Sequence, residues 1–163
     1  MAYFPVFIDL TGKHVLVIGG GRIAERRIRT LLEFGCRVTV IAPELGGTLK
    51  TLLMEKRSGS ESIIWKKKNY ELEDLNGTEE EDPPVFVLAA ALKEVNDLVV
   101  RDCQAKKIPV NHASDRDQCD FYFPGIAKDG DTVVGITSGG KSHRLAAELS
   151  ELIRTFLRET WKA

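Results

Sequence analysis

The sequence predicts an α/β fold in which a doubly wound parallel sheet is followed by a β-hairpin and a helix. Apolar, β-branched runs alternate with helical patterns through the first 111 residues, as in parallel sheets with helical crossovers. The strand patterns are apolar on both faces, which is typical of strands buried within such a sheet. Beyond residue 111 the strand–helix alternation stops, and a hairpin pattern begins that is followed by one helical pattern. We therefore expect one domain at 1–112 and a second region at 113–163.

The elements of the first part follow in regular order. We expect strands at 14–18, 38–42, 63–65, 85–89 and 108–111, and helices at 23–34, 45–56 and 94–105. Gly35 predicts the end of the first helix, and Pro43 the end of the second strand. We interpret the lysines at 66–68 as a solvated strand end, with a phosphate-binding patch as the alternative. Residues 73–84, which include the acidic run 79–82, are expected to form an exposed loop.

The last part contains a hairpin pattern and an amphipathic helix. The apolar runs 121–123 and 132–136 flank a turn at 128–131. A helix from Ser142 to about Trp161 places apolar side chains on one face, at Leu145, Leu149, Leu152, Ile153 and Phe156. Such a face needs a partner surface, so we expect a homodimer formed through this region. The alternative is that hairpin and helix fold back on their own domain.

Composition excludes several classes of protein. Lys and Arg number 23 against 24 Asp and Glu, a net charge of -1, so the chain lacks the basic excess of nucleic-acid or anionic-membrane binders. The apolar run 85–92 is too short to cross a bilayer, and the N-terminus shows no export signal. Cys36, Cys103 and Cys119 have no paired spacing. We therefore expect no disulfide framework, no metal site and a cytoplasmic protein.

A glycine-rich turn lies between the first strand and the first helix. Gly19, Gly21 and Ala24 match the pattern G-x-G-x-x-[GA]. The first glycine allows a tight turn, the second lets the backbone approach a pyrophosphate, and the alanine lets helix and strand pack closely. Free N–H groups at the helix start, from Arg22 and Ile23 onward, favour phosphate binding. The sequence thus predicts a Rossmann-like dinucleotide site at residues 1–112, with a purely structural glycine turn as the alternative.

The end of the second strand bears on the choice of dinucleotide. NAD sites usually carry an acidic residue there, which binds the ribose hydroxyls. Here Pro43 and Glu44 follow the strand, and Glu44 carries the one carboxylate near the end of this strand. Arg37 lies at the opposite end of the strand, where it cannot meet a 2′-phosphate. We therefore expect NAD rather than NADP as the cofactor.

Glu25, Arg26 and Arg27 directly follow the glycine turn, and other distinctive blocks occur along nearly the whole chain. They comprise residues 5–7 and 10, 15–27, 31–35, 38–44, 95–96, 110–111, 119–124 and 136–142. In these blocks and in their order, the sequence resembles precorrin-2 dehydrogenases, including the dehydrogenase/ferrochelatase module of siroheme synthases.

The resemblance implies a chemistry and a set of roles. The family carries out NAD-dependent oxidation of precorrin-2 to sirohydrochlorin for siroheme or cobalamin, in some members with insertion of ferrous iron. By resemblance, Ala89 and Ala90 would lie near the cofactor, and the tetrapyrrole would lie beside the nicotinamide near Asn111 and His112. The oxidation releases a hydride to the nicotinamide and a proton to a base or solvent.

Two departures from the family pattern concern the reacting groups. Family members have Asn-Val-x-Asp where this chain has Asn111-His112-Ala113-Ser114, which puts Ser114 in the place of the presumed catalytic aspartate. Asp115 follows directly and is the candidate substitute, while His112 fits an exposed loop histidine better than a base. The family's Ala-Ala-Thr-Asp is here replaced by apolar residues at 88–92. Family members usually continue into a further helical domain, whereas this sequence ends at Ala163. Together with the two departures, this keeps open the alternative of a non-catalytic NAD- or tetrapyrrole-binding module of the same fold.

A second glycine-containing segment precedes the last helix. Ser138, Gly139, Gly140 and Lys141 could bind a substrate carboxylate through N–H groups and the lysine ammonium. The alternative is a helix start capped by Ser142, and the two are compatible.

Overall fold

The computed structural model describes residues 3–55, 63–78 and 82–160. These form two compact units, one of residues 9–121 and one that combines residues 3–8 with 122–160. The boundary lies after Phe121, later in the chain than the division expected at residue 112.

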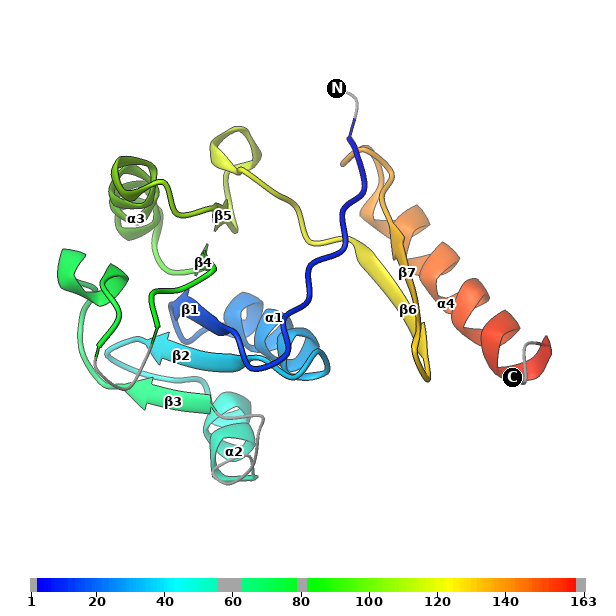
Figure 1. Cartoon of the computed structure of the whole chain (residues 1–163), viewed down its shortest axis with the longest axis horizontal. Helices are drawn as coiled ribbons and strands as arrows, with labels where there is room; N and C mark the ends of the chain where they lie inside the picture. The colour runs from blue at the N-terminus through cyan, green and yellow to red at the C-terminus, as the bar shows by residue number, and fades with distance from the viewer. Residues whose placement is uncertain (1–2, 56–62, 79–81, 161–163) are drawn as a thin grey trace. The chain divides into compact units, whose positions relative to one another are not determined.

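The first unit contains a five-stranded parallel sheet in the order β3-β2-β1-β4-β5 (Figure 1). Its strands are β1 (His14–Ile18), β2 (Arg37–Ile41), β3 (Ile63–Lys66), β4 (Phe86–Ala89) and β5 (Val110–His112). The chain winds outward from β1 to β3, then returns to pair β4 with the other side of β1. This reversal confirms the predicted doubly wound fold. It also creates, between β1 and β4, the switch point at which open α/β sheets bind ligands.

Three helices connect the strands: α1 (Arg22–Leu32), α2 (Gly47–Glu55) and α3 (Lys93–Lys106). Each begins and ends close to the expected positions, although Lys56, the predicted end of the second helix, lies outside the described residues. Helix α3 ends because Lys107 takes the left-handed conformation, with φ of 58°. Helix α1 thus returns the chain from β1 to β2, α2 from β2 to β3 and α3 from β4 to β5, and all five strands run parallel.

The inner strands of the sheet are buried on both faces, whereas the edge strand β3 is partly exposed. All five residues of β1 are buried. Leu16 and Ile18 pack in one cluster with Val99 and Val100 of α3. The alternate residues of β1 face the other side, as alternation along a strand requires. This explains why the strand sequences read as continuous apolar runs.

The segment between β3 and β4 is not wholly an exposed loop, contrary to the prediction. It contains a 3₁₀ turn, η1 (Leu72–Leu75), whose Leu75 is buried in the cluster beneath α3. The Tyr70 hydroxyl also donates to Asp102 of α3 at 3.1 Å. A single apolar residue among acidic neighbours carried too weak a periodic signal for this packing. Residues 79–81 of the acidic run lie outside the described residues.

The second unit pairs a hairpin with a helix: β6 (Gly125–Asp129), β7 (Thr132–Ile136) and α4 (His143–Thr160). The prediction that residues 121–123 form the first hairpin strand is wrong. The register runs from Asp129↔Thr132 to Gly125↔Ile136. It stops there because the next residue, Pro124, has no N–H to donate. The expected end of α4 at Trp161 lies outside the described residues.

Helix α4 contacts the hairpin through a stripe of small and apolar residues. A Cβ on Gly125 would lie 2.4 Å from the Ser150 hydroxyl, so helix and strand approach closely at this glycine. Ser150 and Leu157 are buried. The predicted apolar face is a neighbouring stripe that stays exposed, with Leu152 at 66% and Phe156 at 53% exposure. Within residues 3–55, 63–78 and 82–160, no helix is long and apolar enough to cross a membrane.

Candidate functional site

The turn after β1 can be built only with glycine at its first position. Gly19 has φ of +118°, and a Cβ there would lie 2.3 Å from the Ala90 carbonyl oxygen. The Gly19 N–H donates to the Ile41 carbonyl at 2.9 Å, and the Ala90 N–H donates to the Ile18 carbonyl at 2.8 Å. The turn is thereby fixed between the ends of β2 and β4.

Gly20, the middle residue of the motif, is also required, which the pattern did not predict. A Cβ on Gly20 would lie 2.3 Å from the Glu44 carbonyl oxygen. The Gly46 N–H donates to the Gly20 carbonyl at 2.9 Å. The chain that leaves β2 therefore packs directly on the glycine turn, so the backbone of Glu44 is held beside it.

Unlike Gly19 and Gly20, Gly21 is not required to be glycine by any contact among the described residues. It is the N-cap of α1 with extended backbone, and a Cβ there would meet nothing among the described atoms within 4 Å. No described side chain caps this helix start. The first N–H groups of a helix have no partner within the helix. An uncapped helix start in front of open space fits a phosphate-bearing ligand such as a dinucleotide pyrophosphate.

The remaining residues of the motif divide between surface and core. Arg22 and Ile23 are exposed at the start of α1, and Ala24 is fully buried. The burial of Ala24 confirms the close packing of helix and strand that the motif predicts. Arg22 and Ile23 lie at the helix start, where the predicted cofactor site needs them.

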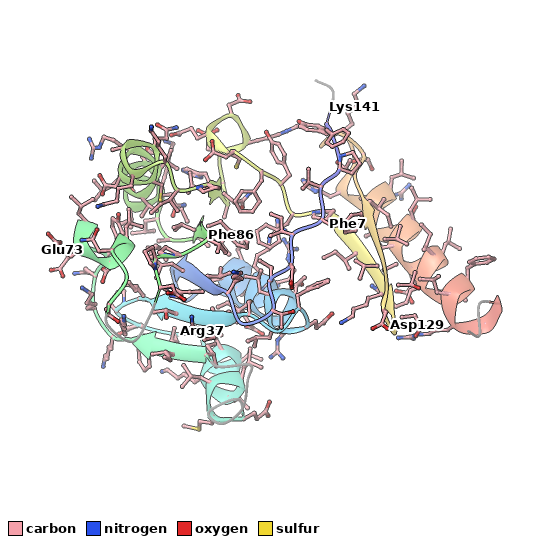
Figure 2. All side chains as sticks on the ribbon, viewed as in Figure 1. Phe7, Arg37, Glu73, Phe86, Asp129 and Lys141 are labelled. Atoms are coloured by element: carbon pink, nitrogen blue, oxygen red, sulfur yellow. The ribbon has the colours of Figure 1, made fainter. Side chains whose placement is uncertain are left out.

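At the end of β2, Pro43 and Glu44 are exposed. Arg37 begins β2 at its other end, where its guanidinium donates to the Gly12 carbonyl and pairs with Asp82 at 3.3 Å (Figure 2). Among the lysines that follow β3, Lys68 pairs with Glu71 at 2.7 Å and with Asp74 at 3.0 Å.

A buried asparagine fixes the chain after β4. Ala89 is buried, and Ala90 directly after β4 contacts the glycine turn. The Ala91 N–H donates to Asn96 Oδ1 at 2.8 Å, and Asn96 Nδ2 donates to the Ala91 carbonyl at 3.2 Å. Asn96 is fully buried. The sequence pattern marked this residue only as part of a matching block, although an asparagine among apolar helix positions signals such a contact.

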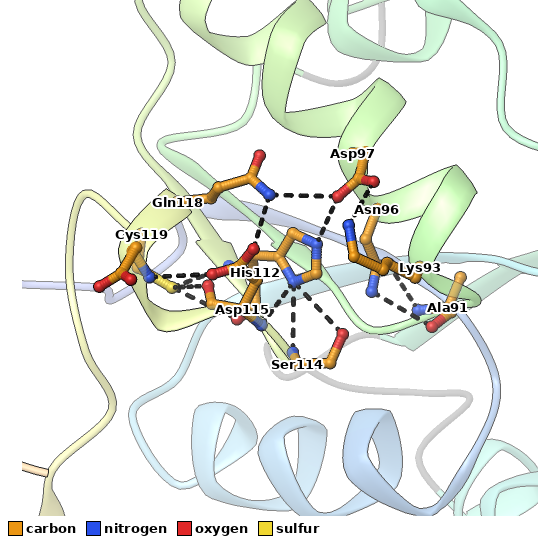
Figure 3. Close-up of polar contacts among 10 residues, drawn as sticks. Ala91, Lys93, Asn96, Asp97, His112, Ser114, Asp115, Gln118 and Cys119 are labelled. Atoms are coloured by element: carbon orange, nitrogen blue, oxygen red, sulfur yellow. Dashed lines mark hydrogen bonds and ion pairs between the residues drawn. The ribbon is translucent and has the colours of Figure 1, made fainter.

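His112 is buried at the end of β5, so the expectation of an exposed loop histidine is wrong (Figure 3). Its Nδ1 accepts from the Asp115 N–H at 2.9 Å and from the Ser114 N–H at 3.2 Å. Its Nε2 lies 3.2 Å from Asp97 Oδ1 of α3. The error arose because polar residues follow His112 in sequence, whereas in the fold they turn back and cover it.

Asp115 and Ser114, the predicted catalytic residues, have different surroundings. The Asp115 carboxylate caps the 3₁₀ turn η2 (Arg116–Gln118), accepting from the Asp117 N–H at 3.1 Å and from Gln118 Nε2 at 2.8 Å. These bonds, that of Gln118 first, lower the pKa of Asp115. Ser114 is exposed. Asp115 is thus a carboxylate with both oxygens engaged, and the exposed Ser114 has its hydroxyl 3.5 Å from His112 Nδ1.

The outer edge of β5 is covered by the residues that follow η2. The Asn111 side chain is buried and donates to the Phe121 carbonyl at 2.8 Å. The Cys119 sulfur accepts from the His112 N–H at 3.2 Å. The Asp120 carboxylate accepts from the Val110 N–H at 2.9 Å. These bonds replace a further strand at the sheet edge, and they direct the Asn111 side chain inward rather than toward a ligand.

The second glycine-containing segment forms the start of α4. Ser142 Oγ accepts from the Leu145 N–H at 3.1 Å, which confirms the predicted helix cap. Ser138 Oγ bonds to both backbone groups of Ser142. Gly139 and Gly140 have φ of +65° and +75°, and Lys141 is exposed (Figure 2). The segment belongs to the second unit, and its role in carboxylate binding stays a prediction.

The ends of β1, β2, β4 and β5 bring the predicted cofactor residues and residues 111–115 to one edge of the sheet, because parallel strands end at the same edge.

A hollow of about 280 Å³ lies at the opposite, amino end of β5. It is lined by Gln104, Lys107, Ile108, Pro109 and Asp120. Across the described part of the chain, no group of three or more His, Cys, Asp or Glu could hold a metal ion. None of Cys36, Cys103 and Cys119 forms a disulfide.

Comparison with known proteins adds three findings. A family model described as "Putative NAD(P)-binding" matches residues 6–125. The probable multifunctional siroheme biosynthesis protein HemA of Ruminiclostridium josui is 38% identical over 154 residues, which is 93% of this chain and 28% of that protein. The siroheme synthase of Buchnera aphidicola is 35% identical over 159 residues, 96% of this chain and 31% of that protein.

A solved structure extends the similarity to three dimensions. SirC, a precorrin-2 dehydrogenase, matches with a TM-score of 0.71 and 27% identity over 94% of this chain and 70% of that one. The chain spans less than a third of the length of the two curated relatives. The predicted resemblance is nevertheless confirmed along nearly the whole chain. The chain therefore belongs to this NAD(P)-binding family, together with siroheme synthases and a precorrin-2 dehydrogenase.

Proposed function

We propose that this protein is an NAD-dependent dehydrogenase that oxidises precorrin-2 to sirohydrochlorin in the siroheme or cobalamin pathway. The observation that carries the proposal is the match to SirC over 94% of this chain, because it covers both units. The glycine turn supplies the second support, since its open helix start fits a dinucleotide.

The proposed cofactor site follows the carboxyl ends of the strands. Gly19, Gly21, Arg22 and Ile23 bind the pyrophosphate at the start of α1, where backbone N–H groups and the helix dipole favour negative charge. Ala89 and Ala90 lie beside the nicotinamide, because Ala90 contacts the glycine turn directly.

NAD is preferred over NADP in this proposal. The backbone of Glu44 lies against Gly20, which supports a role for Glu44, with Pro43, at the adenosine ribose. A carboxylate there accepts hydrogen bonds from both ribose hydroxyls and repels a 2′-phosphate. Arg37 is bound to Gly12 and Asp82 at the other end of β2, so it offers no phosphate contact.

The reaction removes one hydride and one proton from precorrin-2. NAD, when bound, accepts the hydride. Asp115 is a weak acceptor for the proton, since hydrogen bonds occupy both of its carboxylate oxygens and lower its pKa. We propose that Ser114 contacts the substrate, that Asp115 holds the loop, and that the proton passes to solvent. The His112 side chain supports this loop from inside, whereas the Asn111 side chain donates to the Phe121 carbonyl beyond η2.

The second unit has two proposed roles. Ser138, Gly139, Gly140 and Lys141 bind a carboxylate of the tetrapyrrole, through the N–H groups of a turn with two left-handed glycines and the exposed ammonium. The exposed apolar stripe of α4 forms a homodimer interface, because apolar side chains such as Leu152 and Phe156 gain by leaving water.

A non-catalytic module that binds NAD or the tetrapyrrole is the second candidate. It is favoured by Ser114 in the place of the family's aspartate and by the engaged carboxylate of Asp115. Anaerobic absorbance spectra of the protein with precorrin-2, with and without NAD, separate the two. The proposal predicts sirohydrochlorin only when NAD is present, whereas ligand binding without conversion supports the module. Ferrous iron added to the same reaction tests for metal insertion.

A further inference from the structure

We infer that His112 is a positioning residue whose neutral imidazole sets the backbone of Ser114 and Asp115 at the edge of the proposed active site. The inference rests on the proposed function for its catalytic consequence. Its structural part rests on the hydrogen bonds from the Ser114 and Asp115 N–H groups to His112 Nδ1 (Figure 3).

The hydrogen bonds determine which nitrogen carries the proton. Nδ1 accepts from two backbone N–H groups, those of Asp115 at 2.9 Å and Ser114 at 3.2 Å. A nitrogen that accepts cannot also carry a hydrogen in the ring plane, so Nδ1 is unprotonated. The proton of the neutral ring therefore resides on Nε2, which donates to Asp97 Oδ1 at 3.2 Å.

The imidazole is one link of a closed ring of contacts. Asp97 Oδ1 also accepts from Gln118 Nε2 at 3.2 Å. Gln118 Nε2 in turn donates to the Asp115 carboxylate at 2.8 Å, and the Asp115 N–H returns to His112. Lys93 pairs with the second oxygen of Asp97 at 2.6 Å. The ring thus joins α3, β5 and η2, and it holds the loop on both sides of Ser114.

Burial separates this role from that of a general base. The His112 side chain has 0% exposure, and both ring nitrogens have partners inside the unit. Accepting a substrate proton at Nδ1 would turn that nitrogen into a donor facing two N–H groups. The backbone of Ser114 and Asp115 would then lose its acceptor. His112 therefore acts through the loop rather than on the substrate.

Two substitutions at His112 separate the role of Nδ1 from that of Nε2. His112→Asn keeps an acceptor oxygen near the position of Nδ1, and His112→Gln keeps a donor near Nε2 but removes that acceptor. We expect His112→Gln to lower kcat about tenfold or more, because a displaced loop misaligns the substrate. His112→Asn lowers kcat less than His112→Gln. The KM for NAD changes little in either variant, since the glycine turn is untouched. Thermal unfolding and NAD titration verify that both variants are folded.

The tautomer gives a test that is independent of activity. Long-range ¹H–¹⁵N spectra of the intact protein identify the protonated nitrogen of each of its three histidines, and the His112 signals are assigned by their loss in the His112→Asn variant. The inference predicts a proton on Nε2 and slow exchange of the Ser114 and Asp115 amides. A proton on Nδ1, or equal kcat in the two variants, overturns it. If the parent protein oxidises no precorrin-2, the proposed function fails, while the tautomer and amide exchange still decide the role of His112.

Discussion

The Gly21→Asp variant is expected to separate cofactor binding from folding. Gly21 is the N-cap of α1 with φ of −87° and ψ of −175°, a conformation that any residue adopts. A Cβ there meets no described atom within 4 Å. Aspartate is a better N-cap than glycine, so we expect the free energy of unfolding without cofactor to rise by about 0.3 kcal/mol.

NAD binding is expected to change in the opposite direction. The new carboxylate would occupy the N–H groups at the start of α1 and repel the pyrophosphate. Loss of two charge-assisted hydrogen bonds, at about 1.5–3 kcal/mol each, raises the Kd for NAD by about 10²- to 10⁴-fold.

Calorimetric titration measures the Kd, and thermal unfolding with and without NAD measures stability. We expect NAD to raise the Tm of the parent protein and to leave that of Gly21→Asp unchanged. Gly21→Ala is the matched control, because it adds a Cβ without charge and leaves the N–H groups available. An NAD affinity within about threefold of the parent in Gly21→Asp would refute the proposed pyrophosphate site.

Further variants test the surroundings of this site. Gly19→Ala forces φ of +118° on a residue with a Cβ and brings that atom within 2.3 Å of a backbone carbonyl; we expect it to lower the free energy of unfolding by about 1–3 kcal/mol or more, and an unchanged urea midpoint would contradict this. Glu44→Ala should raise the Kd for NAD about tenfold and that for NADP less; equal losses would remove the assigned ribose contact. Asp115→Asn keeps an oxygen that can cap η2, so its kcat should exceed that of Asp115→Ala, whereas a general base would give equal losses in both. Burial raises the pKa of the Cys103 thiol to about 12, so an alkylating reagent should label it only after unfolding, and prompt labelling of the native protein would show that the thiol is reachable.

The sheet and the glycine turn could be predicted from the sequence because local signals specify them. Continuous apolar runs such as residues 14–18 indicate strands buried on both faces. Gly19 and Ala24 meet the physical demands that the motif assigns, a tight turn and close helix packing, while the role of Gly21 at a pyrophosphate stays a prediction. The helix cap at Ser142 could likewise be predicted, because the capping hydrogen bond joins residues only three positions apart in the sequence.

Contacts between distant segments could not be predicted in the same way. Gly20 is required by the Glu44 carbonyl, which the sequence places 24 positions away. His112 is buried because Gln118 and Asp97 close over it from η2 and α3. Gly20 and His112 thus depend on partners that local periodicity does not specify. In the hairpin the error was local, because the aromatic residues at 121–123 resemble a strand, whereas the register ends at Gly125, next to Pro124.

The stoichiometry of precorrin-2 oxidation tests the central claim most directly. Under anaerobic conditions the purified protein is given precorrin-2 and excess NAD, and NADH and sirohydrochlorin are measured in the same sample. A precorrin-2 dehydrogenase yields one NADH for each sirohydrochlorin, and none of either with the Gly21→Asp variant. Sirohydrochlorin formed without NADH, or neither product from a protein that binds both ligands, would contradict the account.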